Sequence, residues 1–76
     1  MTPVAVGSEL EDETAELMSW YVNDGAVVTA GTPLAEMSTS KAMFDVAAPA
    51  SGTLRHAKEV GAFVGVGEPI GWIDDA

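Results

Sequence analysis

The sequence contains no cysteine, only one histidine, and no stretch that approaches the length of a membrane-spanning apolar segment. Without cysteine there is no disulfide to stabilise the fold, so stability must come from apolar packing. His56 alone does not supply the ligands of a zinc site. The first residues, Met1 to Val4, lack the basic region and apolar run of an export signal. We therefore expect neither export nor membrane insertion, and a cytoplasmic location.

Basic side chains are also scarce. Three of them face twelve acidic ones, which gives a formal charge of −9 and a pI near 4.1. Two of the three, Arg55 and Lys58, belong to no basic patch, which argues against binding to nucleic acid or to an anionic membrane. Protein partners are expected to present positive surface.

The length limits the chain to one small domain over residues 1–76. A domain of this size buries only about 60% of its unfolded surface. Apolar residues make up 47% of the chain but only five side chains are aromatic. Val, Ala, Leu, Ile and Met must therefore fill most of a thin core.

The first third of the chain predicts strands and loops, with helix essentially absent. Val4–Val6 is a short apolar run that Gly7 ends, and it predicts a first strand. The acidic run from Glu9 to Glu16 has no sustained apolar stripe at helical spacing, so we interpret it as a solvated loop. Residues 14–22 predict a largely buried strand, closed by the turn residues 23–25, N-D-G.

A repeat relates the two halves of the chain. Residues 25–37, GAVVTAGTPLAEM, recur thirty-six positions later as residues 61–73, GAFVGVGEPIGWI, with glycines and prolines at matching offsets. Each half is too small to bury its own apolar face, so the halves must pack on one another. We expect an all-β fold, a flattened barrel or sandwich of two antiparallel, roughly four-stranded sheets related by a pseudo-two-fold.

The stretch from Glu36 to Gly52 predicts a strand, a tight turn and a second strand, with Lys41 at the tip. Ser40 and Lys41 as the central pair suit a type I turn. A shift of thirty-six positions toward the N-terminus relates Lys41 to Ala5, and the same shift toward the C-terminus relates it to a position just past the last residue. We therefore expect the lysine at the end of the molecule opposite the termini.

No catalytic constellation is found. Ser38, Thr39 and Ser40 have no histidine nearby to activate them, so we interpret them as turn polars. Glu36 and Asp45 flank the tip, but nothing predicts an enclosed pocket that would separate their pKa values. The chain is therefore predicted to be a substrate for other proteins and not an enzyme by itself.

The aromatic and imidazole side chains are interpreted as structural. His56 corresponds to Trp20 in the repeat, which favours a packing role over a metal or catalytic one. Trp20 and Trp72 are expected to pack in or beside the core.

The residues around the tip, Lys41-Ala42, Asp45-Val46, Pro49 and Gly52, resemble the attachment hairpin of lipoyl domains, the swinging-arm carriers of 2-oxo acid dehydrogenase complexes. The likeness covers nearly the whole chain. It implies that Lys41 carries lipoic acid in amide linkage and shuttles acyl groups and reducing equivalents between active sites. The cofactor brings the redox chemistry, and the domain supplies positioning and recognition. Absence of cysteine fits, because a thiol would exchange with the dithiolane.

The resemblance also implies partners. These are a lipoate ligase or lipoyl transferase, and the 2-oxo acid decarboxylase, acyltransferase and dihydrolipoamide dehydrogenase components of a complex. The residues expected to be read by partners are Ser40, Ala42, Glu36, Asp45, Glu11, Asp12 and Glu13. In lipoyl domains the loop equivalent to the acidic run lies near the hairpin.

The chain departs from the lipoyl pattern at the turn. Family members usually read E-T-D-K-A, whereas this chain reads S-T-S-K-A, with Ser38 and Ser40 where acids are common. Gly7 stands where many members have proline. Charges beside the lysine are part of the surface that partners read, so these differences concern the choice of partner.

Two alternatives to a lipoyl carrier remain. Biotinyl carrier domains of carboxylases share the architecture, but methionine typically stands on both sides of their lysine. Here the neighbours are Ser40 and Ala42, and Met43 is one place too far. The second alternative is an acidic interaction domain that carries no modification.

Overall fold

The structure, a computed structural model, describes residues 1–6 and 14–74. This part of the chain forms strands joined by turns. The strands are β1 (Thr2–Ala5), β2 (Ala15–Trp20), β3 (Val27–Val28), β4 (Pro33–Ser38), β5 (Met43–Ala47), β6 (Gly52–His56), β7 (Phe63–Val64) and β8 (Pro69–Asp74). Within the described ranges there is no helix, and thus none long and apolar enough to span a membrane.

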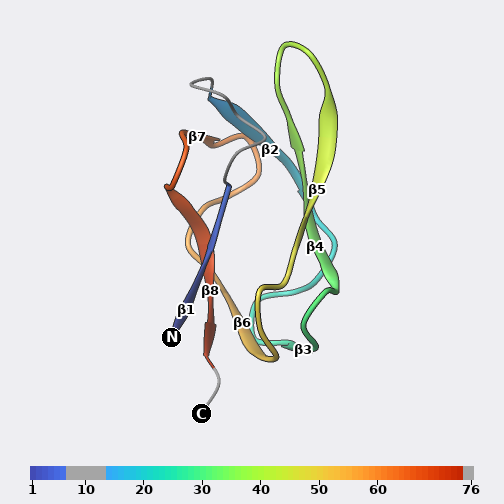
Figure 1. Cartoon of the computed structure of the whole chain (residues 1–76), viewed down its shortest axis with the longest axis vertical. Helices are drawn as coiled ribbons and strands as arrows, with labels where there is room; N and C mark the ends of the chain where they lie inside the picture. Colours follow the sequence, from blue (N-terminus) through green and yellow to red (C-terminus); the bar gives the residue numbers. More distant parts are fainter. Residues whose placement is uncertain (7–13, 75–76) are drawn as a thin grey trace.

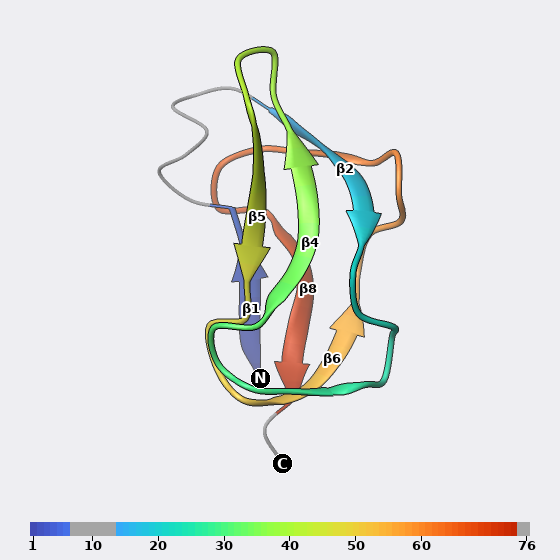
Figure 2. The same cartoon turned by 90° about the vertical axis from the view of Figure 1, so that its right-hand side faces the viewer.

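Two four-stranded antiparallel sheets pack face to face (Figures 1 and 2). One has the strand order β1-β8-β6-β3 and the other β5-β4-β2-β7. They are not closed into a barrel, so the fold is a flattened sandwich. Each strand of the first half corresponds to the strand four places later: β1 to β5, β2 to β6, β3 to β7 and β4 to β8. Exchanging the members of each of these pairs converts one strand order into the other. The expected all-β fold, and its pseudo-two-fold relation at the level of topology, are confirmed.

The repeat is visible in the turns as well as in the strands. The N–H of Ala26 donates to the carbonyl of Asn23 at 3.1 Å, and the N–H of Ala62 donates to that of Glu59 at 3.0 Å. Gly25 and Gly61 have φ of 88° and 97° in these turns. Such φ values are strained for residues with a Cβ, which explains why glycine recurs at this offset.

One prediction drawn from the repeat, that Lys41 corresponds to Ala5, was wrong. Ala5 pairs with Pro69 just as Ala47 pairs with Pro33, so the counterpart of Ala5 is Ala47 and not Lys41. The reason is that more residues separate β1 from β2 than separate β5 from β6, and the offset of thirty-six holds only after that insertion. The expected consequence holds nevertheless. Figure 1 shows the β4–β5 turn at one end and the start of β1 and end of β8 toward the other.

Strand boundaries differ from the sequence prediction by one or two residues. The first strand is Thr2–Ala5, and Val6 lies outside it although its side chain is buried. The second strand ends at Trp20, two residues before the predicted Val22. Glu16 ends the acidic run that was predicted as a loop and also falls within the strand predicted over residues 14–22; it belongs to β2. The other residues of the acidic run up to Glu13 lie outside the described part of the chain.

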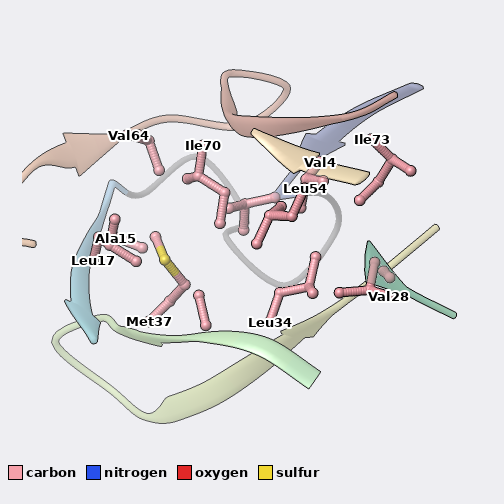
Figure 3. Close-up of a cluster of buried hydrophobic side chains, with 13 residues drawn as sticks. Val4, Ala15, Leu17, Val28, Leu34, Met37, Leu54, Val64, Ile70 and Ile73 are labelled. Atoms are coloured by element: carbon pink, nitrogen blue, oxygen red, sulfur yellow. The ribbon is translucent and has the colours of Figure 1, made fainter. Parts of the chain in front are cut away.

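The core lies between the two sheets (Figure 3), and among the described residues its fully buried members include no aromatic side chain. The buried residues are Val4, Val6, Ala15, Leu17, Val28, Leu34, Ala35, Met37, Ala48, Leu54, Val64, Ile70 and Ile73. Trp20, Phe44 and Val46 pack against this cluster from its edge. This is the thin aliphatic core that the composition predicted.

A stacked ring pair joins the two halves. The rings of Trp20 and His56 lie 3.8 Å apart between centroids and 9° from parallel. The indole N–H of Trp20 donates to the carbonyl of Lys58 at 3.1 Å, and Nε2 of His56 lies 2.9 Å from the carbonyl of Val22. A carbonyl only accepts, so Nε2 carries the proton. Lys58 is the repeat counterpart of Val22, so the two hydrogen bonds are related by the pseudo-two-fold.

Candidate functional site

The tip of the β4–β5 hairpin is a four-residue connection. Ser38 and Met43 form the last paired positions of the two strands. The N–H of Thr39 donates to the carbonyl of Ala42 at 2.8 Å, which leaves Ser40 and Lys41 as the central pair. The predicted position of Lys41 at the tip is confirmed.

The hydroxyl of Thr39 organises the turn. Its Oγ1 accepts hydrogen bonds from the N–H of Lys41 at 3.2 Å and of Ala42 at 3.1 Å. It donates to the carbonyl of Ala42 at 3.1 Å. These three bonds use the full capacity of a hydroxyl, one donor and two acceptor sites. Sequence reasoning treated Thr39 only as a turn polar. The signal that was available is the tendency of a threonine to bond the backbone N–H groups that follow it.

Lys41 is exposed, and no ion pair within residues 1–6 and 14–74 engages it. The ion pair found there joins Nζ of Lys58 to Glu68 at 3.2 Å. Ser40 and Ala42, the neighbours of Lys41, are exposed as well. A primary amine in this position fits an amide bond to a carboxylic acid cofactor, because neither burial nor an ion pair among these residues competes for it.

Glu36 and Asp45 lie directly opposite one another on β4 and β5, below the tip. Like charges in this arrangement repel. The hydroxyl of Tyr21 donates to Oδ1 of Asp45 at 2.7 Å, and this hydrogen bond, with smaller contributions from burial and from the charges of Asp45 and Glu36, raises the pKa of Tyr21 to about 12. The structure therefore brings the two predicted recognition acids together and adds a tyrosine. Sequence reasoning missed this role of Tyr21, because the contact spans twenty-four residues.

A row of side chains crosses the outer face of the same sheet just below the tip. Glu16 pairs with Phe63 on one side and with Ser38 on the other, and Ser38 pairs with Met43. Directly paired residues point to the same face of a sheet. The two large apolar members are exposed, Phe63 by 65% and Met43 by 56%.

This row borders a surface trough of about 430 Å³ beside the lysine turn. Its lining residues are Thr14, Glu16, Ser38, Thr39, Ser40 and Phe63. Sequence reasoning did not identify the trough, because β2, β4 and β7 come together there only through strand pairing. The remaining predicted recognition residues, Glu11, Asp12 and Glu13, lie outside the described part of the chain.

A second hollow, of about 610 Å³, surrounds the stacked rings of Trp20 and His56. The polar groups around the two rings make hydrogen bonds within the fold. Oδ1 of Asp24 accepts from the backbone N–H of His56 at 2.7 Å, and both ring N–H groups donate to carbonyls. This hollow therefore presents no nucleophile with a free base beside it.

Comparison with known proteins agrees with the geometry. The model of the biotin/lipoyl family, described as "Biotin-requiring enzyme", matches residues 3–73. A search of curated proteins finds no match. Domains of this family carry covalently attached lipoic acid or biotin and are not catalytic alone. The chain, whose described residues form a sandwich of eight strands with an exposed hairpin lysine, belongs to the biotin/lipoyl attachment family.

Proposed function

We propose that the chain is a lipoyl carrier domain and that Lys41 is its attachment residue. One observation carries the proposal. An exposed primary amine stands at the tip of a hydrogen-bonded hairpin, at the end of the molecule opposite the start of β1 and the end of β8 (Figure 2). A carrier tethered through its chain ends would present this lysine to the active sites of other proteins.

The residues of this chain would position and present the attached group. Lipoic acid supplies the redox and acyl-carrying chemistry when it is bound. Thr39 holds the turn in one conformation, so the stem of Lys41 starts from a defined place. Glu36 and Asp45 add negative charge on the sheet below it, which would favour partners with a basic entrance.

The neighbours of Lys41 support lipoate over biotin. Ser40 and Ala42 flank the lysine, whereas biotinyl domains typically have methionine on both sides. A biotinyl carrier domain of a carboxylase is the second candidate, because the matching family includes carriers of both cofactors. For the lipoyl carrier, the partners would be a lipoate ligase or transferase and the three enzyme components of a 2-oxo acid dehydrogenase complex.

Intact mass after ligase treatment tests the proposal. The wild-type domain and the variants Lys41→Arg and Lys58→Arg are incubated with lipoate and a lipoate ligase, and separately with biotin and a biotin ligase. Arginine keeps the positive charge but has no primary amine for the amide bond. We expect one lipoyl group on the wild type and on Lys58→Arg, and none on Lys41→Arg.

The controls separate misfolding from loss of the site. Lys41 is exposed, so its replacement should change the free energy of unfolding by no more than about 0.5 kcal/mol, measured by urea denaturation. Label on Lys41→Arg would mean that another residue is the attachment site. Biotin in place of lipoate on the wild type would establish the second candidate. If the wild type takes up neither lipoate nor biotin, the result favours an unmodified interaction domain.

A further inference from the structure

The trough beside the lysine turn has no role in the function proposed above. Its lining residues are Thr14, Glu16, Ser38, Thr39, Ser40 and Phe63. Three of its residues, 38–40, lead directly into Lys41, so the backbone of that lysine lies next to the trough, and a long flexible group attached at Nζ could fold back into it. Its opposite side is Phe63 on β7, which is 65% exposed. A trough bordered by the attachment turn and by an exposed aromatic ring suits the free end of the attached group.

The two cofactors of the family share a sulfur-containing ring. Lipoic acid and biotin both end in a five-membered ring that contains sulfur, at the end of a flexible pentanoyl chain. Sulfur packs favourably at the edge of an aromatic ring. In the described part of the chain Phe63 is the exposed aromatic ring that lines the trough, and Val27, its counterpart in the repeat, lies in β3 of the other sheet.

We propose that this trough is a resting site for the sulfur-containing ring at the end of the group that Lys41 carries, with Phe63 as its principal contact. The inference rests on the proposed function only in requiring that Lys41 be acylated. Glu16 and Ser38 also line the trough and lie beside Phe63 on the sheet, because they are paired with one another and Glu16 is paired with Phe63. A ring in the trough is partly withdrawn from solvent, so it is less accessible to small reagents than a ring on a fully extended arm.

Chemical loading makes the test independent of any ligase. Lys58→Arg removes the other lysine and preserves a cation for Glu68. With the α-amino group blocked, an activated ester of lipoic acid then acylates Lys41 alone. A second sample carries biotin, and a third carries pentanoic acid, which has the chain without the ring.

Nuclear Overhauser contacts between the attached ring and the aromatic protons of Phe63 are the primary readout. We expect them in the lipoyl and biotinyl samples, and we expect chemical-shift changes at Glu16 and Phe63 that the pentanoyl sample does not reproduce. Phe63→Ala should abolish these changes. Val27→Ala is the matched control, because Val27 occupies the equivalent strand position and is 81% exposed. It should leave the contacts intact.

Reduction of the lipoyl disulfide by dithiothreitol is the second readout. We expect it to be roughly two- to tenfold faster in Phe63→Ala than in the parent and in Val27→Ala, which is the change that one sulfur–aromatic contact corresponds to. Shift changes confined to residues 39–42, together with equal reduction rates in all three proteins, would overturn the resting site. Failure of enzymatic lipoylation would instead count against the proposed function and would leave this chemical test unaffected.

Discussion

The two lysines of this chain lie in different environments. Nζ of Lys58 lies 3.2 Å from a carboxylate oxygen of Glu68, and its side chain is 34% exposed. Lys41 is exposed at a turn and enters no ion pair within the described residues. Acylation of Lys58 would therefore cost an ion pair, whereas acylation of Lys41 costs only hydration. This difference is the residue-level basis for assigning the attachment to Lys41.

Tyr21 offers a residue-level prediction on pH. The hydrogen bond to Asp45 raises the pKa of Tyr21 to about 12 from an ordinary value of 10.0, so folding favours the protonated phenol. The stabilisation is complete below pH 10 and is lost as the pH rises toward 12. We expect the free energy of unfolding of the wild type to fall more steeply over this range than that of Tyr21→Phe, as measured by urea denaturation.

The titration itself provides the control. Tyr21 is the one tyrosine in the sequence, so tyrosinate absorbance reports it alone. Asp45→Asn should move the midpoint down toward 10, because the charge that opposes ionisation is removed. A wild-type midpoint already near 10 would show that the Tyr21–Asp45 hydrogen bond does not persist in solution.

At the scale of the element, the β4–β5 hairpin fixes the position of Lys41 relative to the two sheets. Cross-strand pairing runs from Pro33 and Ala47 up to Ser38 and Met43, with one irregularity near the open end. Above the last pair, the Thr39 hydroxyl bonds the backbone of Lys41 and Ala42 across the turn. Register and hydroxyl together allow the lysine stem only one starting point.

Moving the lysine by one position tests whether a ligase reads this geometry. In the double variant Lys41→Ser, Ala42→Lys the amine moves from the centre of the turn to its last residue, whose N–H and carbonyl both bond Thr39. We expect modification to fall by at least about tenfold relative to the parent, measured as the initial rate of lipoylation by mass spectrometry. Ala42→Ser, which leaves Lys41 in place, is the control. Equal rates for shifted and parent proteins would mean that local sequence suffices.

At the scale of the whole molecule, the sheet β1-β8-β6-β3 depends on close contact between two of its strands. A Cβ added at Gly71 of β8 would lie 2.5 Å from the carbonyl oxygen of Arg55 on β6 and 3.4 Å from the Trp20 ring. A backbone atom in a paired strand cannot move aside cheaply. We therefore predict that Gly71→Ala lowers the free energy of unfolding by about 1–3 kcal/mol.

Gly65→Ala is the matched substitution, because nothing lies within 4 Å of the added Cβ. It should change stability by less than about 0.5 kcal/mol. Both variants are compared with the wild type by urea denaturation, with one m-value, the dependence of the unfolding free energy on urea concentration, fitted to all three proteins. Similar stability for the two would mean that β6 and β8 are less closely packed than the structure shows.

The charge of the whole molecule leads to a prediction about association. A formal charge of −9 should attract a positively lined active site, and acylation of Lys41 removes one more cation. We expect the rate at which a 2-oxo acid decarboxylase component acylates the lipoylated domain to fall steeply with ionic strength. Neutralising Glu11, Asp12 and Glu13 should lower the on-rate more than it raises the off-rate. Kinetics that are flat in salt and unchanged in this variant would leave the acidic run with no part in recognition.

Much of the fold follows from the sequence by itself. Alternating apolar positions, turn glycines and the repeat of residues 25–37 predict two similar halves built from short strands, and they place Lys41 on a hairpin. These are local signals, since strand alternation and turn chemistry depend on neighbouring residues. The absence of cysteine and the scarcity of cations also come directly from the sequence, and the first means that no disulfide stabilises the fold.

Only the tertiary structure decided which distant residues meet. The Trp20–His56 stack, the Tyr21–Asp45 hydrogen bond and the row from Phe63 to Met43 all depend on strand order and register. Register is set by the burial of the inner face as a whole, and a shift of one residue would turn every side chain of a strand to the other side. The trough beside Lys41 is a product of that register, because β2, β4 and β7 are brought together by pairing and not by proximity in the sequence.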